Sequence, residues 1–255
     1  MKPTFLKYDK PLLTAMILCN TPEECIAKIR LSLADGAEAF GIQLDHLKRE
    51  YRTERYLTEI FAACEGLPIY VTSYRGANSK GYSDEDCVEL LLLAQKCGAT
   101  LMDVIGDLYW PTSKYQLCIE QNAVCRQMKL IERIHDKGGE VLMSCHTNAS
   151  LSVQENEIIA NEQILRGADI IKIVNKTDNK ADIPVFIESI QKIVGMTDKK
   201  LLFLVSGEGR IIRYIGPNFG VCMYLCVHNH GPNDTKEQPV LKNLKAIRDN
   251  IRFDI

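Results

Sequence analysis

The arrangement of apolar residues constrains the fold of this chain more than any other feature. Over 255 residues, short runs that are largely apolar alternate eight times with longer segments, most of them amphipathic. The runs lie at residues 12–18, 39–44, 68–73, 100–105, 140–144, 169–174, 201–205 and 220–226. Such runs are typical of parallel strands covered on both faces, and their alternation with helices predicts a parallel sheet wrapped by helices. Eight units in about 250 residues predict an α/β fold, the (β/α)8 or TIM barrel, as a single domain over residues 1–255.

The segments between the runs carry helix start and stop signals. The predicted helices lie at residues 22–34, 51–64, 84–97, 114–137, 153–166, 183–194 and 239–250. Thr21-Pro22 can open the first helix, and Gly98 can end the third. The segment between the seventh and eighth strands has little helix signal, so we expect it to be short or irregular. A doubly wound open sheet is the rival fold, but no G-x-G-x-x-G follows the first strand and there is no P-loop.

Composition limits the classes of partner. A net charge of −2 with no basic tract argues against nucleic acid or an anionic membrane as the main partner. No apolar stretch approaches the roughly 20 residues of a membrane span, and residues 1–10 lack the apolar core of a signal peptide. The ten cysteines form no C-x-x-C motif and mostly fall in apolar runs, which predicts buried free thiols. We therefore expect a cytoplasmic protein in a reducing compartment.

Lys172 lies within the apolar run G-A-D-I-I-K-I-V at residues 167–174. Removing an ammonium ion from water is costly, so burial favours the neutral amine. A neutral lysine amine can form a Schiff base with a ketone or an aldehyde. The alternative is a lysine at the end of a strand, whose charged group reaches solvent past an apolar stem.

Further polar residues lie where the predicted strands end. In a barrel the chemistry gathers at the C-terminal ends of the strands, so these side chains can converge on one mouth. The candidates are Gln43, Asp45, Arg75, Asp103, Cys145, His146, Ser206, Arg213, His228, His230 and Gln238. His146 follows the fifth strand, one strand away from Lys172, and could shuttle protons during imine chemistry. A histidine that only caps the strand end by hydrogen bonds is the alternative.

Arg75 and Arg213 follow the third and the seventh strand. Guanidinium groups at a barrel mouth can hold a carboxylate or a phosphate through two parallel hydrogen bonds, which predicts a small anionic substrate. Surface ion pairs are the alternative for both arginines. The sequence G-E-G-R at residues 207–210 could instead form a phosphate cradle after the seventh strand.

Five motifs occur in order along the chain. They are G-A-E at residues 36–38 followed by Asp45, T-S-Y-R at 72–75, S-C-H at 144–146, G-A-D-I-I-K-I at 167–173, and G-R-I-I-R-Y-I-G-P-N-F-G at 209–220. This set resembles type I 3-dehydroquinate dehydratase. The resemblance covers nearly the whole chain in the barrel register, and the last two motifs are its most specific parts.

The resemblance implies a (β/α)8 dehydratase of the shikimate pathway that uses neither a metal nor an organic cofactor. Lys172 would form an imine with the substrate ketone. His146 would remove the proton next to the imine carbon and then protonate the departing hydroxyl, giving a syn elimination of water. Arg213 would hold the carboxylate of a small carboxylated ketone with help from Arg75, and Gln238 matches the family's C-terminal glutamine. Members of this family are often homodimers.

Several positions depart from the family pattern. Where the family has E-x-R-x-D, residues 41–45 read G-I-Q-L-D, so Gly41 and Gln43 replace the acid and the arginine that contact substrate hydroxyls. Ser79 aligns with the acid that partners the histidine, residues 103–105 read D-V-I in place of D-x-E, and residues 228–238 replace the A-P-G-Q loop. Loss of a group that bonds a substrate hydroxyl changes specificity by about 10⁴-fold. We therefore expect a different ring or polyol substrate, bound near Gln43 and Ser79, or weak activity on 3-dehydroquinate.

Three other functions compete with the dehydratase. A class I aldolase would use the same Lys172 imine to cleave a carbon–carbon bond of a hydroxyketone. A metal enzyme would use His228 and His230, with Cys226, Cys145 and His146 predicted near the same rim. Finally, a barrel without catalysis would only bind a ligand.

Overall fold

The computed structural model describes residues 3–8, 10–112, 115–231 and 234–251. The chain divides into two compact units. Unit 1 comprises residues 1–103 and 225–255, and unit 2 comprises residues 104–224. The boundaries fall within strand β4 (Leu101–Ile105) and strand β8 (Met223–Cys226).

The strands lie where the apolar runs predict them. Besides β4 and β8 they are β1 (Leu12–Ile17), β2 (Ala39–Gln43), β3 (Ile69–Thr72), β5 (Glu140–His146), β6 (Ile170–Thr177) and β7 (Lys200–Gly207). Their order is β7-β6-β5-β4-β3-β2-β1-β8. Strands β1 to β4 pair in parallel, and so do β5 to β7. Sequential parallel strands joined by helices define the (β/α)8 barrel, so the predicted fold class is confirmed.

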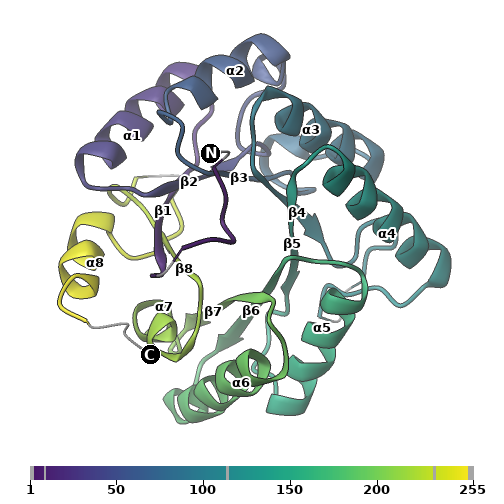
Figure 1. The fold of residues 1–255 in the computed structure, drawn as a ribbon, viewed down its shortest axis with the longest axis vertical. Helices are drawn as coiled ribbons and strands as arrows, with labels where there is room; N and C mark the ends of the chain where they lie inside the picture. Colours follow the sequence, from purple (N-terminus) through teal and green to yellow (C-terminus); the bar gives the residue numbers. More distant parts are fainter. Residues whose placement is uncertain (1–2, 9, 113–114, 232–233, 252–255) are drawn as a thin grey trace. The chain divides into compact units, whose positions relative to one another are not determined.

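The helices alternate with the strands. They are α1 (Pro22–Ala34), α2 (Glu54–Ala62), α3 (Asp84–Cys97), α4 (Gln121–Asp136), α5 (Val153–Leu165), α6 (Ile183–Met196), α7 (Ile212–Ile215) and α8 (Leu241–Arg248), with 3-10 turns η1 (Arg49–Tyr51), η2 (Ala77–Ser79), η3 (Lys180–Asp182) and η4 (Gly216–Phe219). In unit 2, α5 packs on β6 and α6 packs on β7, with both helices on the same side of the strands (Figure 1).

Local sequence explains where these helices begin and end. Ser83 and Ser152 open α3 and α5 with capping boxes, in which the serine side chain accepts from a backbone amide of the first turn. Gly98 ends α3 in the left-handed conformation at φ 116°, as its position in the sequence predicts. Between β7 and β8 only α7 and η4 form, which confirms the expected irregular connection.

The predicted helix at residues 114–137 is wrong in its first part. Helix α4 begins only at Gln121, where the Glu120 side chain accepts a hydrogen bond from the amide of Ala123. Tyr115 and Gln116 have φ angles of 61° and 51°, which a right-handed helix excludes. The beginning of the predicted range, at residue 114, lies outside the described residues. The Gln116 side chain contacts His146 from this non-helical loop.

The strands are buried on both faces, as their composition predicts. All six residues of β1 are buried, and β6 is buried from Ile170 through Ile173. In unit 2, Phe186 of α6 packs near Phe203 of β7, with 6.2 Å between the ring centroids. Strands β6 and β7 extend past the predicted ends, and their pairing continues to Thr177 and Gly207.

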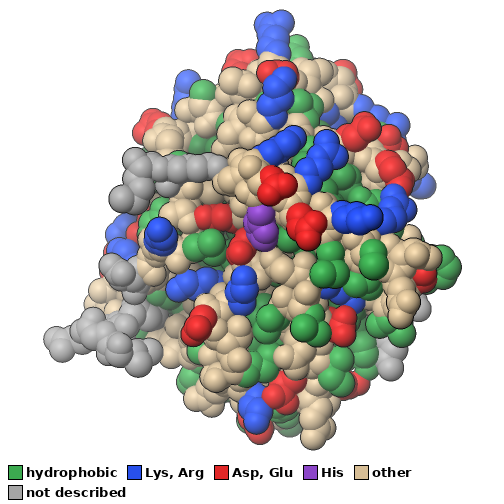
Figure 2. Space-filling view, turned by 45° about the vertical axis from the view of Figure 1, so that its right-hand side comes forward, with side chains coloured by type: hydrophobic (Ala, Val, Ile, Leu, Met, Phe, Trp, Pro, Cys, Tyr) green, Lys and Arg blue, Asp and Glu red, His purple; other side chains and the backbone are tan. Residues whose placement is uncertain are grey.

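Charged side chains of both signs are interspersed on the face drawn in Figure 2. A representative exposed pair joins Lys96 to Glu54, whose side chains are 65% and 58% exposed. Exposed pairs of this kind contribute little to stability because water and salt screen them. Among the helices of the described residues, none has the length and apolarity needed to cross a membrane.

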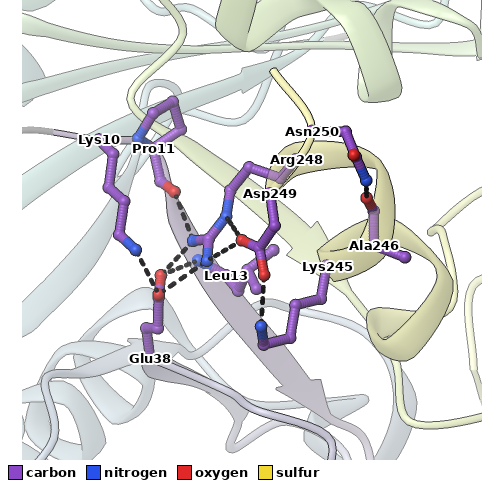
Figure 3. A network of polar contacts seen from close by, with 9 residues as sticks. All are labelled: Lys10, Pro11, Leu13, Glu38, Lys245, Ala246, Arg248, Asp249 and Asn250. Atoms are coloured by element: carbon purple, nitrogen blue, oxygen red, sulfur yellow. Dashed lines mark hydrogen bonds and ion pairs between the residues drawn. The ribbon is translucent and has the colours of Figure 1, made fainter. Parts of the chain in front are cut away.

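A partly buried ion network in unit 1 fastens α8 to the start of the sheet (Figure 3). Arg248, 3% exposed, bonds both carboxylate oxygens of Glu38 and donates to the carbonyl of Pro11. Lys10 lies 3.4 Å from the same carboxylate, and the amide of Leu13 donates to it at 3.1 Å. The network therefore joins the C-terminal helix to β1 and to the loop before β2.

Removing Arg248 should destabilise the protein far more than removing an exposed cation of the same helix. Arg248→Met leaves the Glu38 carboxylate without its two charged hydrogen bonds, which should cost about 3 kcal/mol of unfolding free energy. The matched control is Lys245→Met, because the Lys245–Asp249 pair is exposed and should contribute about 0.5 kcal/mol or less. Urea denaturation measures both values. Equal losses of unfolding free energy in the two variants would show that the hydrogen bonds from Arg248 to Glu38 do not stabilise the protein.

The same network should make stability depend on pH. Burial alone would raise the pKa of Glu38, but the hydrogen bonds from Arg248 and Leu13 and the charges of Arg248 and Lys10 outweigh it and lower the pKa. The stabilisation is therefore complete above the unfolded-state value of about 4.3 and is lost as pH falls through the lower folded-state value. The stability difference between the wild type and Glu38→Gln should shrink as pH falls from about 6 to 3. A constant difference in urea titrations would contradict this assignment.

Candidate active site

Lys172 occupies the middle of β6 and is 4% exposed. It pairs in register with Ser144 of β5 and Leu202 of β7, so it has a strand on each side. Ile171 and Ile173, its neighbours along the strand, are fully buried. This position differs from that of an exposed lysine at a strand end. The amine thus lies in a place where water is scarce.

The backbone of Lys172 is held by a side chain from the neighbouring helix. Gln163 of α5, fully buried, accepts from the Lys172 amide at 2.9 Å and donates to the Lys172 carbonyl at 3.0 Å. Its Nε2 also lies 3.3 Å from the sulfur of Cys145 on β5. Gln163 of α5 thereby holds the backbone of Lys172 on β6 and also contacts the neighbouring strand β5. The sequence contained a usable signal, because Gln163 is polar and follows Ile159 by one helical turn on the buried face of α5.

His146 is the last residue of β5 and pairs in register with Val174 of β6. Side chains two residues apart on a strand share a face, so His146 lies on the same face as Ser144 and Lys172. It lies two residues beyond the level of Lys172, roughly 7 Å along the strands. Gln116, in the loop before α4, contacts both the backbone and the ring of His146. Nothing in the sequence pattern marked Gln116 as part of the site.

Arg213 lies in α7 and is 6% exposed. Its Nε donates to the carbonyl of Val205 at 2.9 Å, and its Nη2 donates to the hydroxyl of Ser206 at 3.2 Å. Val205 pairs with Asn175, three residues beyond Lys172, so the guanidinium is tethered roughly 10 Å further along the sheet. In unit 2 the amine of Lys172, the imidazole of His146 and the guanidinium of Arg213 therefore follow one another along the direction of the strands.

In unit 1, Gln43 is the last residue of β2 and pairs in register with Thr72 of β3. Asp45 follows it and is buried, and its carboxylate accepts from the Thr72 hydroxyl at 3.1 Å. Burial raises the pKa of Asp45 despite the nearby His46 and the hydrogen bond from Thr72. This acid therefore belongs to the packing between β2 and β3.

Arg75 and Ser79 both make bonds inside unit 1. The Arg75 guanidinium forms two hydrogen bonds with Asp84, the first residue of α3, at 2.6 and 3.0 Å. Ser79 is fully buried, and its hydroxyl accepts from Arg52 at 2.8 Å. The ion pair considered as an alternative for Arg75 is therefore present in this structure.

Gly41 lies between two large side chains in the parallel register of β1, β2 and β3. Met16 and Tyr70 are its register partners, and a Cβ atom at Gly41 would overlap the Met16 sulfur and lie 3.1 Å from a Tyr70 ring carbon. The Tyr70 hydroxyl donates to Asp103, and the Tyr74 hydroxyl donates to the same carboxylate oxygen at 2.6 Å. Side chains of neighbouring strands thus fill the volume that a residue larger than glycine at position 41 would need.

The loop after β8 does not put both histidines beside the strand ends. His228 Nδ1 lies 2.6 Å from the Asp35 carboxylate, in the connection that leads from α1 into the start of β2. His230 contacts the backbone carbonyl of Gln238 at 2.9 Å. The expectation that His228 lies at the C-terminal ends of the strands is wrong, because its ring is held by Asp35, where α1 ends and the chain turns back towards the start of β2.

Gln238 is 5% exposed, and its side-chain Oε1 has no hydrogen-bond partner among the described residues. Within the same described part of the chain, no group of three or more His, Cys, Asp or Glu side chains is arranged to hold a metal ion. His228 and His230 are instead engaged by Asp35 and by a backbone carbonyl. These contacts give the histidine pair a structural role in the loop.

Comparisons with known proteins identify the family of this chain and match its fold. The family model for type I 3-dehydroquinase matches residues 14–250. A search of curated proteins found no match. The 3-dehydroquinate dehydratase of Geobacillus kaustophilus HTA426 superposes with a TM-score of 0.80 at 13% identity, covering 94% of this chain and 90% of that one.

Two further solved structures have a similar fold. The type I enzyme of Clostridium difficile, solved with covalently modified comenic acid, gives a TM-score of 0.78 at 18% identity over 94% of this chain and 92% of that one. The enzyme of Enterococcus faecalis gives 0.77 at 15% identity over 95% of both chains. The family match covers most of the sequence, and these structures share its fold. The chain therefore belongs to the type I 3-dehydroquinase family and is a dehydratase, a carbon–oxygen lyase.

Proposed function

We propose that this protein eliminates water from a carboxylated cyclic hydroxyketone through an imine on Lys172. The observation that carries the proposal is the burial of Lys172, 4% exposed, on the same sheet face as His146. The unprotonated amine of a lysine is the form that attacks a carbonyl. Membership of the dehydratase family supports the same chemistry.

The reaction would proceed in steps that balance. The Lys172 amine adds to the substrate ketone, and the carbinolamine loses water to give an iminium ion, which acts as an electron sink. His146 removes the proton on the neighbouring carbon and then returns it to the departing hydroxyl group as water leaves. Hydrolysis of the iminium releases the enone and restores the amine. No metal or organic cofactor is needed for these steps.

Arg213 would bind the substrate carboxylate. Its guanidinium is oriented by the hydrogen bonds to Val205 and Ser206, and a planar guanidinium suits a carboxylate. Gln238 would offer its buried amide to the substrate. Arg75 would assist only by sharing or releasing its bonds to Asp84.

The natural substrate would differ from 3-dehydroquinate in the groups that it presents to the second strand. Gly41 and Gln43 replace an acid and an arginine of the family pattern, and Met16 and Tyr70 fill the space beside Gly41. Ser79, the other substituted position, is bonded to Arg52. A substrate ring with fewer hydroxyl groups at that position would need neither the acid nor the arginine for binding.

Borohydride reduction should trap the substrate on Lys172. The protein is incubated with 3-dehydroquinate and with other carboxylated cyclic hydroxyketones, reduced, and analysed by intact and peptide mass spectrometry. Lys172→Ala should lose the adduct and its turnover, whereas Lys176→Ala, which changes an exposed lysine of the same strand, should keep both. Enone absorbance marks dehydration, and aldehyde release would mark an aldolase. Absence of any adduct, together with unchanged turnover in Lys172→Ala, would sink the proposal.

His146→Ala should separate imine formation from proton transfer. The variant should still be trapped by borohydride, because the amine is intact. Its turnover should fall about 10²-fold or more, as expected for loss of a general acid and base. Steady-state kinetics beside the trapping assay measure both quantities. An equal loss of adduct and turnover would mean that the histidine mainly shapes the site.

A further inference from the structure

A single oxygen atom of Gln116 makes two contacts with His146. Oε1 of Gln116 lies 3.0 Å from the backbone nitrogen of His146 and 2.7 Å from its ring nitrogen Nδ1. The backbone N–H can only donate, so the atom that faces it must be the amide oxygen and not the amide nitrogen. This contact fixes the orientation of the Gln116 amide, which is otherwise ambiguous.

The orientation of Gln116 determines the tautomer of the ring. An amide oxygen only accepts hydrogen bonds, so Nδ1 of His146 must carry a hydrogen to donate at 2.7 Å. In the neutral imidazole the other nitrogen, Nε2, then has the lone pair. Nε2 is thus the nitrogen that can accept a proton.

The loop that carries Gln116 has a strained backbone, and several contacts hold it in place. Both Tyr115 and Gln116 adopt left-handed φ angles, 61° and 51°, which cost free energy in residues with a side chain. The Tyr115 hydroxyl bonds Glu155 on α5, and the Cys145 thiol donates to the Gln116 carbonyl at 3.3 Å. Gly106 leaves room for this carbonyl, because a Cβ atom there would lie 2.7 Å from it.

Buried polar side chains fasten the same loop from the helix side. Arg166, 2% exposed, donates to the carbonyls of Gly106 and Cys118 at 3.2 and 2.7 Å. Gln127 of α4, fully buried, donates to the Gly106 carbonyl at 3.1 Å and accepts from Arg166 at 2.8 Å. The strained segment is therefore held rigidly, as a side chain that orients a reacting group must be.

We propose that Gln116 is a positioning residue for His146, which holds the ring with a hydrogen on Nδ1 so that Nε2 exchanges protons with the substrate. The inference rests on the proposed acid–base role of His146. A neutral amide here takes the orienting role of the acid that the family pattern places where this chain has Ser79. Since the amide accepts from Nδ1 in both the neutral and the charged ring, the ring stays oriented throughout the cycle.

Nitrogen NMR of the ring tests the contact without any substrate. Protein labelled with ¹⁵N-histidine contains five histidines, and the signals lost in His146→Gln identify His146. At a pH where the ring is neutral, the wild type and Gln116→Glu should carry the hydrogen on Nδ1. Gln116→Leu should lose this preference. A wild-type ring with its hydrogen on Nε2 would overturn the inference.

Kinetics test whether the contact serves catalysis. Gln116→Leu should lower kcat about 10- to 100-fold, which is the usual cost of removing a side chain that orients a functional group. Its KM should change less than about twofold. Gln116→Glu keeps the acceptor and should retain most of the activity. Its carboxylate favours the charged ring, so the acid limb of the pH–kcat profile should move to higher pH by about one to two units.

The matched control is Gln154→Leu, the same substitution at an exposed position of α5, which should behave as the wild type. Equal kcat values for Gln116→Leu and Gln154→Leu, or an unmoved acid limb in Gln116→Glu, would overturn the positioning role. Failure of the proposed function looks different. In that case borohydride traps no ketone on Lys172, whatever the tautomer of His146.

Discussion

The parallel register of β5, β6 and β7 is the constraint on which the chemistry of unit 2 depends. Ser144 pairs with Lys172, and His146 pairs with Val174, so the amine and the imidazole share one face at fixed levels. Because side chains alternate between faces, a shift of one residue would turn His146 away from the lysine. Both faces of β6 are buried from Ile170 through Ile173, so such a shift would exchange the side chains that pack on each face.

Burying polar groups among these strands requires a partner for each, and glutamines of unit 2 supply several. Gln163 satisfies the backbone of Lys172, Gln127 supports the loop after β4, and Gln116 orients His146. An amide side chain can both donate and accept hydrogen bonds without adding a charge to the interior. A neutral side chain can therefore orient a reacting group without the desolvation cost of an ion.

In unit 1, by contrast, packed side chains and hydrogen bonds occupy the places where the family pattern has polar groups. The register of Met16, Gly41 and Tyr70 leaves no space for a side chain at position 41, and Arg52 bonds the hydroxyl of Ser79. Two tyrosines instead converge on the carboxylate of Asp103. The ion network that ties Arg248 to Glu38 joins α8 to β1 and to the loop before β2 in this unit (Figure 3).

The sequence by itself determined the strands, most helices, the barrel class and the strand positions of Lys172 and His146. These features follow from the spacing of apolar residues and from caps such as Ser83 and Gly98, which act over a few residues. Only the tertiary structure decided the conformation of Gln116, the pairing of Arg75 with Asp84 and the place of His228. These contacts join residues distant in the chain or in irregular loops, where no periodic pattern records which side chains will meet.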